Sequence, residues 1–353
     1  MEIFNRKIGP NEPTYFIAEI GSNFDGDLNR AKELIKIAAE SGADAAKFQH
    51  YTAETLVSDF GFNSLNNSVQ THQSEWKDSV SSTYNKASLA KEWTEELSEI
   101  SHSLGMGFFT SPYSMNLVDY VEPYVDAYKV GSGDITYIEI IEAMSIKNKP
   151  ILIATGAASL LEVKNAMKVL DGNFNNTCIM QCNTNYENGT ENPDFQNLRV
   201  LNQYAKLFPE VVLGLSCHSK GWTGVLGSVA LGARVIEKHF TDDDKRQGPD
   251  HGFATTPDEW RQMVDETRSL EAMLGDGIKK VEDNEKMTVI VQQRCLRAKE
   301  DLSRGEVITR KNIEALRPCP QDGIKPFEIN KVIGKNLLKP LKKGEHISYD
   351  YLD

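Results

Sequence analysis

The stretch YFIAEIGSNFDGDLNRAKELIKIAAESGADAAKFQ, residues 15–49, decides the fold class of this chain. It opens with an apolar run that ends at Glu19, and it closes with a second apolar run that reaches Lys47 and Gln49. Between the two runs, apolar residues recur every three or four positions after a suitable N-cap at Asp27, which predicts an amphipathic helix. A strand, a helix and a second strand in this order are typical of a parallel α/β architecture.

The same alternation continues along the chain and predicts a (β/α)8 barrel. Six further β-rich runs follow, and helical patterns separate most of them: GFFTSPYS (107–114), AYKVGSGD (127–134), ILIATG (151–156), TCIMQCNTNY (177–186), VVLGLSCHS (211–219) and ARVIEKHF (233–240). Catalysis in such barrels takes place where the carboxyl ends of the strands converge. Polar residues stand at these ends, so the pattern indicates an enzyme: Glu19, Lys47, Gln49, Thr110, Ser111, Lys129, Ser132, Asp134, Asn183, Tyr186, Ser216, His218, Glu237 and His239.

Length, charge and cysteine content narrow the class of protein. The 353 residues suffice for a barrel of about 250 residues and one small domain. A net charge of −12 argues against non-specific binding to nucleic acid or to an anionic membrane. We expect no secretory signal and no transmembrane helix. Five cysteines without a CxxC pair are typical of reduced thiols, so we expect a cytoplasmic protein.

Two segments depart from the strand–helix rhythm. Residues 51–86 are polar and too long for an ordinary connection, which indicates a lid or substrate-contacting loop, or alternatively a surface insertion. After a barrel domain at 1–275, residues 276–286 are typical of a linker, and 287–353 form a compact tail. The tail contains the related turns LSRGEVITRKNI and LKKGEHISYDYL, which predict a small β-rich module with two-fold similarity.

Two histidines at the ends of neighbouring strands are candidate metal ligands. His218 and His239 end the seventh and eighth runs, and neutral imidazoles bind divalent transition metals. Glu237 precedes His239 by two positions, so both side chains face the same side of the strand. Two protein ligands leave open positions, which suits Mn²⁺, Mg²⁺ or Co²⁺ better than a structural zinc. The alternative is a pair of hydrogen-bonded core histidines.

A second group of residues is suited to an anion. Lys47 and Lys129 each follow a strongly apolar run, so we expect them to point into the pocket rather than to solvent. Together with Thr110, Ser111, Ser132 and Ser216 they predict a cradle for phosphate and carboxylate groups, to which the backbone of 131–133 adds N–H donors. Glu19 and Asp134 are candidate acid–base groups, with structural ion pairs as the alternative.

The chain resembles a known family, the sialic acid synthases. The resemblance rests on AEIGSNFDGD, AAKFQ, FFTSPYS, YKVGSGD, IATG, GLSCHS and EKHFTDDDKRQGPDHGF, and on LRPCPQDGIKP in the tail. It spans essentially the whole chain and implies a (β/α)8 barrel followed by a small β-rich, antifreeze-like (SAF) domain. It also implies a condensation of phosphoenolpyruvate with an N-acylated hexosamine, which yields a nonulosonic acid and phosphate by C–O cleavage.

The resemblance also implies roles for individual residues. It implies that His218 and His239 are the ligands of a divalent metal, with Mn²⁺ as the expected ion. It implies catalytic roles for Glu19, Lys129, Asp134 and Glu237. Phosphoenolpyruvate binding falls on Lys47, Thr110, Lys129, Ser132 and Ser216. Acceptor binding falls on Gln49, Asn183, Tyr186, Asp250 and Phe253, and on Arg317 from the second subunit of a homodimer with swapped tails.

Several positions depart from the family pattern. Cys217 stands where an aspartate is usual, Asp134 where a glutamate is usual, and Gln181 where a histidine is usual. The NHNG-like residues after the first strand are replaced by Asn-Phe-Asp-Gly at 23–26, and the region 183–187 differs as well. The changes at Asp134 and at 183–187 touch the acceptor sugar more than the donor, so N-acetylmannosamine and a 2,4-diacetamido-trideoxyhexose both stay open as acceptors.

Three other functions compete with this one. The first is a related 3-deoxy-ulosonic acid synthase with a different aldose acceptor. The second is an aldolase that uses free pyruvate, in which Lys129 or Lys47 forms a Schiff base. The third is a non-catalytic barrel that binds carbohydrate, which the presence of both histidines, both lysines and Glu19 argues against.

Overall fold

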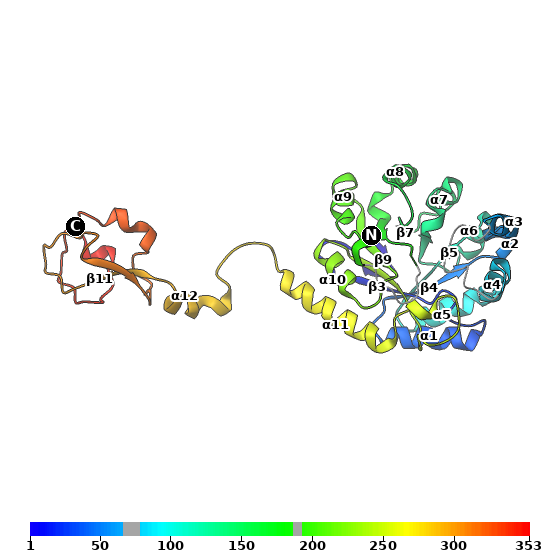
Figure 1. Ribbon diagram of the computed structural model, residues 1–353, viewed down its shortest axis with the longest axis horizontal. Coiled ribbons are helices and arrows are strands. Elements are labelled where there is room, and N and C mark those ends of the chain that lie inside the picture. The colour runs from blue at the N-terminus through cyan, green and yellow to red at the C-terminus, as the bar shows by residue number, and fades with distance from the viewer. Residues whose placement is uncertain (66–77, 186–192) are drawn as a thin grey trace. The chain divides into compact units, whose positions relative to one another are not determined.

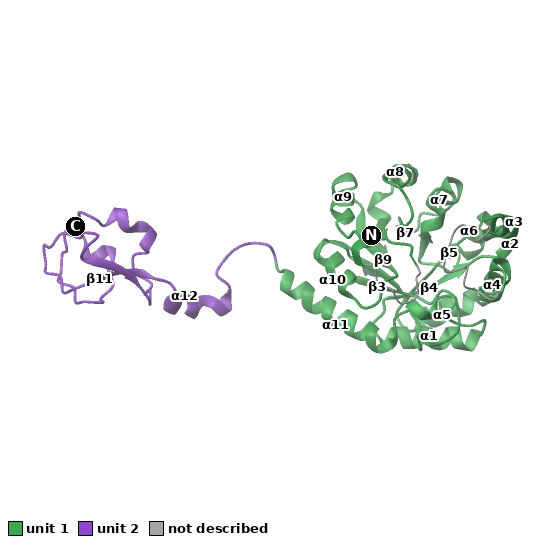
Figure 2. Cartoon of the chain, viewed as in Figure 1, with its two compact units in different colours: residues 1–275 green, residues 276–353 purple. Residues whose placement is uncertain are grey.

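The computed structural model describes residues 1–65, 78–185 and 193–353. The chain divides into two compact units, Met1–Gly275 and Asp276–Asp353, which Figure 2 shows in green and purple. Tyr186, one of the predicted acceptor-binding residues, lies outside the described residues.

The first unit is a closed barrel of eight parallel strands (Figure 1). The strands run in chain order around the barrel, and the last pairs with the first through Val235 and Tyr15. This confirms the predicted (β/α)8 architecture. The bounds of the strands are β3 Tyr15–Glu19, β4 Ala45–His50, β5 Gly107–Pro112, β6 Ala127–Val130, β7 Ile151–Ala154, β8 Thr177–Cys182, β9 Val212–Cys217 and β10 Val235–His239.

Helices surround the barrel, and their ends follow from the local sequence. Asp27 caps α1 by accepting hydrogen bonds from the backbone N–H groups of Asn29 and Arg30, as predicted. Ser159 begins α8 with a capping box that pairs it with Glu162. The principal helices of this unit are α1 Leu28–Glu40, α5 Thr94–Ser103, α6 Met115–Val121, α7 Ile138–Ser145, α8 Leu160–Val169, α9 Val200–Leu207, α10 Thr223–Ala230 and α11 Pro257–Leu274.

The amino-terminal end of the barrel is covered by a short hairpin, β1 (Glu2–Ile3) and β2 (Arg6–Lys7). Ile3 and Phe4 lie against Gly107 at the start of β5, and Ile3 is buried in the core of the barrel. The opposite end, where the strands finish, is therefore the end at which a pocket can open.

The segment after β4 contributes three short helices, α2 (Ala53–Leu56), α3 (Asp59–Ser64) and α4 (Val80–Ala87). Tyr51 contacts Tyr84 edge to face, with the ring centroids 5.5 Å apart, so the two ends of this segment meet at the carboxyl end of the barrel.

The second unit is small and has its own hydrophobic core. Helix α12 (Lys286–Gln292) precedes an antiparallel pair, β11 (Cys295–Ala298) and β12 (Ile313–Leu316). The core contains Leu296, Leu302, Ile308, Ile313, Val332, Leu341 and Ile347.

The two related turns of this unit have the same hydrogen bonding. The backbone N–H of Ser303 donates to Glu306 Oε2 at 2.8 Å, and that of Lys342 donates to Glu345 Oε2 at 2.9 Å. Leu302 at the start of one turn and Leu341 at the start of the other exchange both backbone hydrogen bonds. The repeat that is visible in the sequence is therefore also present in the structure.

Across residues 1–65, 78–185 and 193–353, we find no helix with both the length and the hydropathy required to cross a bilayer.

Trp260 on α11 gives a test of how the helical shell is attached to the barrel. Its side chain is fully buried and packs edge to face on Phe16 of β3 and Phe240, which follows β10. We expect Trp260→Ala to lower the free energy of unfolding by about 3–5 kcal/mol, because it leaves a cavity at this contact. The control is Met273→Ala on the same helix, where the side chain is 78% exposed. Urea unfolding that gives both variants the same midpoint would contradict this packing.

Candidate active site

A cavity of about 400 Å³ opens at the carboxyl ends of the strands. It brings together most of the residues that the sequence predicts for the site: Glu19, Lys47, Gln49, Ser111, Lys129, Ser132, Asp134, Ser216, His218, Glu237, His239 and Asp250. These residues come from six of the eight strands or from the segments that follow them, which explains how positions so distant in sequence share one cavity.

Two lysines and two glutamates form a buried charged group at the bottom of this cavity. Lys47 Nζ lies 2.6 Å from Glu19 Oε2 and 4.0 Å from Glu237 Oε2, and Lys129 Nζ lies 3.5 Å from Glu237 Oε1. Each of the four side chains is 7% exposed or less. Ser216 donates a hydrogen bond of 3.0 Å to Glu237 Oε1. We call Glu19, Lys47, Lys129 and Glu237 the charged quartet.

The two carboxylates of the quartet differ in proton affinity. Burial raises the pKa of Glu19 and the negative charge of Glu237 adds to the rise; together they outweigh Lys47 and Gln49, which lower it. Burial also raises the pKa of Glu237, but Lys129 and Lys47 outweigh it and bring the value to about 2. Glu19 is thus the carboxyl of the quartet that is suited to carry a proton, whereas Glu237 stays ionised.

Lys47 is suited to bind an anion in its charged form. Burial lowers the pKa of its ammonium group, but Glu19 and Glu237 have the larger combined effect, and the pKa is raised overall. Lys47 therefore stays protonated at neutral pH and has no lone pair for nucleophilic attack.

The serines of the cavity provide neutral polar groups beside the quartet. Ser132 accepts a 3.0 Å hydrogen bond from the backbone N–H of Gly156. A side chain at position 156 would lie 1.7 Å from Thr184 Oγ1, so this approach of two loops requires glycine. Ser111 is 2% exposed, and its hydroxyl has no hydrogen-bond partner among the described residues.

The two candidate metal ligands are neighbours. The ring centroids of His218 and His239 lie 5.5 Å apart. Burial lowers the pKa of His239 to about 3, despite the opposing charge of Asp250, so its imidazole is neutral at physiological pH. Burial lowers the pKa of His218, but Cys182 and the hydrogen bond with the Asn183 carbonyl outweigh it, and the pKa is raised overall. His218 Nδ1 lies 3.1 Å from that carbonyl oxygen, so the neutral form of the ring carries its proton on Nδ1 and its lone pair on Nε2.

The residues present fit a divalent ion with an incomplete protein ligand set. His239 Nδ1 is buried without a hydrogen-bond partner among the described residues, and it lies 3.8 Å from Asp250 Oδ2. A buried imidazole nitrogen in this state is suited to coordination. Within the described part of the chain, no group of three or more His, Cys, Asp or Glu side chains forms a metal site. A metal here would thus need water or substrate oxygens to complete its coordination.

Thr110 does not line the cavity, which corrects its predicted place in the donor site. Its hydroxyl donates to the Phe48 carbonyl at 2.8 Å and lies 2.8 Å from His50 Nδ1, on the outer face of the barrel. Successive residues of a strand point to opposite faces, so the neighbouring Ser111, which pairs with Gln49, points inward. The cavity position on β5 belongs to Ser111.

Two other predicted acceptor-binding residues, Asn183 and Phe253, also lie away from the cavity lining. The Asn183 side chain donates to the Phe195 carbonyl at 3.1 Å, while its own carbonyl contacts His218. Phe253 packs edge to face on His239, with the ring centroids 4.8 Å apart. Arg317 is an exposed residue of the second unit. Asn183 and Phe253 therefore support the histidines, whereas the role of Arg317 in the cavity of a partner subunit stays a prediction.

Several lining residues were missed by the sequence analysis. They are Ser22, Tyr51, Leu56, Val57, Phe62, Thr83, Tyr84, Ala87, Tyr113, Thr184 and Pro249. Many of them come from residues 51–87, whose irregular pattern predicts a substrate-contacting loop but not which side chains face inward. They give the outer part of the cavity an aromatic and apolar wall.

The fold and this site define a barrel enzyme with a charged, partly apolar cavity at its carboxyl end. Residues 34–279 match the NeuB family, and residues 293–353 match the SAF domain. The chain therefore belongs to the NeuB family, which confirms the resemblance to sialic acid synthases and the nature of the carboxyl-terminal domain.

Several relatives that match over nearly the whole chain are named as synthases. The chain is 33% identical to the N,N'-diacetyllegionaminic acid synthase of Legionella pneumophila, over 99% of both chains. It is 30% identical to the human N-acetylneuraminate-9-phosphate synthase, over 99% of this chain and 95% of that one. A crystal structure of N-acetylneuraminic acid synthetase from Leptospira borgpetersenii, in complex with citrate, matches with a TM-score of 0.72 and 29% identity, over 82% of this chain and 94% of that one.

The assignment of the cavity position on β5 to Ser111, and not to Thr110, can be tested. If phosphoenolpyruvate is the donor, as the family resemblance implies, Ser111→Ala should raise its KM about tenfold, because the substitution removes a buried hydroxyl from the cavity. Thr110→Val should lower the melting temperature and leave that KM unchanged, because its hydroxyl bonds within the barrel wall. Steady-state kinetics and thermal unfolding of both variants check this, and the reverse pattern would restore Thr110 to the cavity.

Asp134 gives a pH-dependent test of the cavity. Burial raises its pKa from 3.8 to about 6, although Lys129 lowers it. A carboxyl whose pKa is higher in the folded protein than in the unfolded chain makes its full contribution to the free energy of unfolding only below its unfolded pKa. This contribution is lost as the pH rises through the folded-state pKa of about 6. Asp134→Asn should therefore match the wild type near pH 4 and exceed its stability at pH 7 by about 1–2 kcal/mol. Urea unfolding across this pH range, without metal, measures the difference; a constant difference would contradict the shift.

Proposed function

We propose that the protein condenses phosphoenolpyruvate with an N-acylated hexosamine to give a nonulosonic acid and phosphate. The observation that carries the proposal is the charged quartet beside the paired histidines His218 and His239, all in one cavity. The relatives named as legionaminic acid and neuraminate-9-phosphate synthases support the same type of reaction.

The donor fits the bottom of the cavity. Phosphoenolpyruvate carries a phosphate and a carboxylate, and Lys47 and Lys129 supply two buried ammonium groups for them. Charge-assisted hydrogen bonds from such groups are stronger than neutral ones. Ser111, Ser132 and Ser216 add neutral polar groups around the same space.

His218 and His239 would hold the metal, with Mn²⁺ as the preferred ion and Mg²⁺ or Co²⁺ as alternatives. When bound, a divalent ion polarises the aldehyde oxygen of an open-chain sugar as a Lewis acid. Asp250 lies next to His239 and faces the same part of the cavity, so it is placed to accept hydrogen bonds from the acceptor's hydroxyl groups.

The bonds change in two stages. C3 of phosphoenolpyruvate attacks the aldehyde carbon of the acceptor, whose oxygen becomes a hydroxyl, and positive charge develops at C2 of the donor. Water then adds to C2 and loses a proton, and phosphate leaves as its bond to C2 breaks, which produces the keto group. Glu19, with its raised pKa, gives a proton to the aldehyde oxygen as C3 attacks and then takes the proton that the water loses, while the proton of the new C2 hydroxyl leaves with the phosphate. Glu237 holds both lysines in place.

The acceptor is bound by groups that are less buried than the charged quartet, including Gln49 and Asp250. Gln49 also donates a 2.6 Å hydrogen bond to Glu19 Oε1, which connects the acceptor side of the cavity with the proposed proton carrier. N-acetylmannosamine, a 2,4-diacetamido-trideoxyhexose and another aldose differ in the groups they present here. In the proposed homodimer, Arg317 from the partner's tail completes this part of the site.

The donor site provides a direct test. Phosphate release should require phosphoenolpyruvate, a divalent metal and an aldose together, and label from ¹⁸O water should enter the keto acid rather than the phosphate. Lys47→Met should abolish the thermal shift that phosphoenolpyruvate causes, whereas Lys164→Met, an exposed lysine on α8, should keep it. Phosphate release from phosphoenolpyruvate alone would indicate a phosphatase instead.

The proposed tail swap is tested by mixing two inactive variants, Lys47→Met and Arg317→Ala. In a swapped heterodimer, one barrel with Lys47 receives the tail with Arg317, so the mixture should recover about a quarter of the wild-type activity. If Arg317 acts on its own barrel, the mixture stays inactive. Co-expression of the two variants, followed by a phosphate-release assay, measures this.

A further inference from the structure

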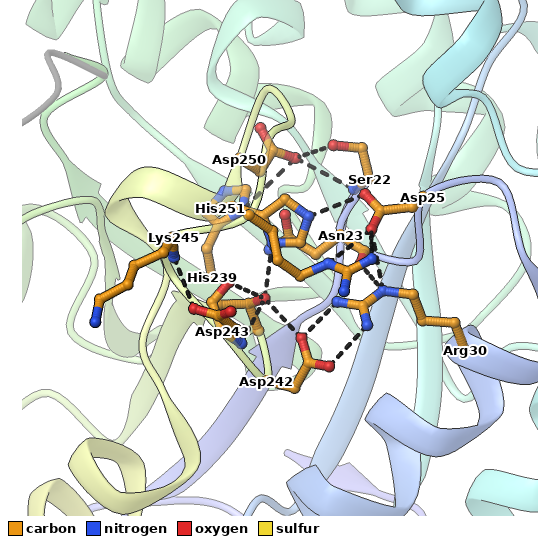
Figure 3. A network of polar contacts seen from close by, with 12 residues as sticks. Ser22, Asn23, Asp25, Arg30, His239, Asp242, Asp243, Lys245, Asp250 and His251 are labelled. Carbon is orange, nitrogen blue, oxygen red and sulfur yellow. Dashed lines mark hydrogen bonds and ion pairs between the residues drawn. The ribbon is translucent and has the colours of Figure 1, made fainter.

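Two loops at the carboxyl end of the barrel are joined by a polar network (Figure 3). One loop follows β3 and contains Ser22, Asn23 and Asp25; the other follows β10 and runs from 240 to 256. The Asn23 side chain donates to the Phe240 carbonyl at 3.0 Å, which joins the starts of the two loops.

Asp25 is the centre of this network. Its Oδ2 accepts hydrogen bonds from Arg246 Nε at 3.0 Å and Nη2 at 2.7 Å, and it lies 3.2 Å from Arg30 Nε. Its Oδ1 lies 3.0 Å from Nε2 of His251, a fully buried ring. The other ring nitrogen of His251 lies 2.7 Å from Thr241 Oγ1.

The backbone at Asp25 is held in an uncommon conformation. Its φ is +52°, in the left-handed region that residues other than glycine seldom adopt, although aspartate tolerates it better than most. Such a conformation persists where surrounding contacts hold it, and it is often found at functional sites. Here it turns the carboxylate toward Arg246 and His251.

The turn that contains Asp250 depends on this anchor. His251 directly follows Asp250, and a side chain at Gly248 would lie 2.6 Å from the His251 ring, so the turn closes tightly over that ring. Asp250 Oδ2 then accepts hydrogen bonds from the Ser22 N–H at 3.2 Å and hydroxyl at 2.8 Å. From this place it faces His239 across 3.8 Å.

We propose that Asp25 is a positioning residue that fixes the turn 246–251 and, through it, sets the Asp250 carboxylate in the acceptor part of the cavity. The proposal rests on the proposed function, because Asp250 is assigned there to the acceptor. It gives a role to the aspartate that replaces the second asparagine of the family's NHNG-like sequence.

A role of Asp25 in stability alone would predict different effects of its replacement on the kinetics. The Arg246 side chain is 42% exposed and that of Asp25 27%, and ion pairs this accessible contribute little to global stability. If Asp25 only stabilised the fold, its replacement would affect donor and acceptor equally. If it positions Asp250, the effect is confined to the acceptor.

The test compares Asp25→Asn with the control Asp27→Asn, which makes the same chemical change two residues away. Asp27 only caps α1, and asparagine is an equally good cap. Without any ligand, hydrogen exchange of the backbone amides in 242–251 should be faster in Asp25→Asn and unchanged in Asp27→Asn. In kinetics with N-acetylmannosamine or a 2,4-diacetamido-trideoxyhexose, kcat/KM for the acceptor should fall about tenfold in Asp25→Asn only, with the KM for phosphoenolpyruvate within about twofold.

A double substitution gives the sharpest comparison. Because Asp25 acts through Asp250, Asp25→Asn should add little further loss in an Asp250→Asn background. Arg246→Gln, a change at the surface end of the network, should reproduce the faster exchange if Asp25→Asn fails to fold.

Unchanged exchange in 242–251, or an equal rise in both KM values, would overturn the proposal. A wild type that turns over neither aldose would count against the proposed function, while the exchange experiment would still decide whether Asp25 positions the turn.

Discussion

The structure depends on burying two ammonium groups and two carboxylates together at the carboxyl end of the barrel. A lone ionised group in such a place would be strongly destabilising, and an imperfect pair hardly less so. Lys47 contacts both Glu19 and Glu237, and Glu237 contacts both lysines, so no charge of the quartet lacks a partner. The closed barrel makes this arrangement possible because it aligns the ends of separate strands in one small space.

The same arrangement gives chemically identical side chains different proton affinities. Glu237 lies between two lysines and stays ionised, whereas Glu19 contacts a single lysine and has the raised pKa. His239 is neutral because it is buried, and the Asp250 carboxylate approaches it without forming a hydrogen bond. Identical chemical groups thus acquire different properties from their surroundings alone, which is the usual basis of acid–base chemistry in enzymes.

Much of the fold and the centre of the site could be predicted from sequence, for a physical reason. Strands buried on both faces are apolar throughout, so a lysine such as Lys47 or Lys129 at the end of one is conspicuous. The same property explains the error at Thr110, since a run that is apolar on both faces does not reveal which of two neighbours points inward. The cavity wall to which Tyr51, Tyr84 and Ala87 contribute, and the role of Asp25, depend on contacts between distant parts of the chain, which no local pattern encodes.

Two glycines next to residues that line the cavity, Gly21 and Gly156, have a practical consequence for engineering. Replacing glycine with alanine is a common way to make a protein more robust, since it reduces the freedom of the unfolded chain. At Gly21 the added carbon would meet Asp250 Oδ2 at 2.8 Å with φ at +53°, and at Gly156 it would collide with Thr184. Gly9 has neither obstacle. Substitutions that make this enzyme more thermostable are therefore best sought at the amino-terminal end of the barrel, which the hairpin β1–β2 covers. The glycines at the carboxyl end are best left unchanged.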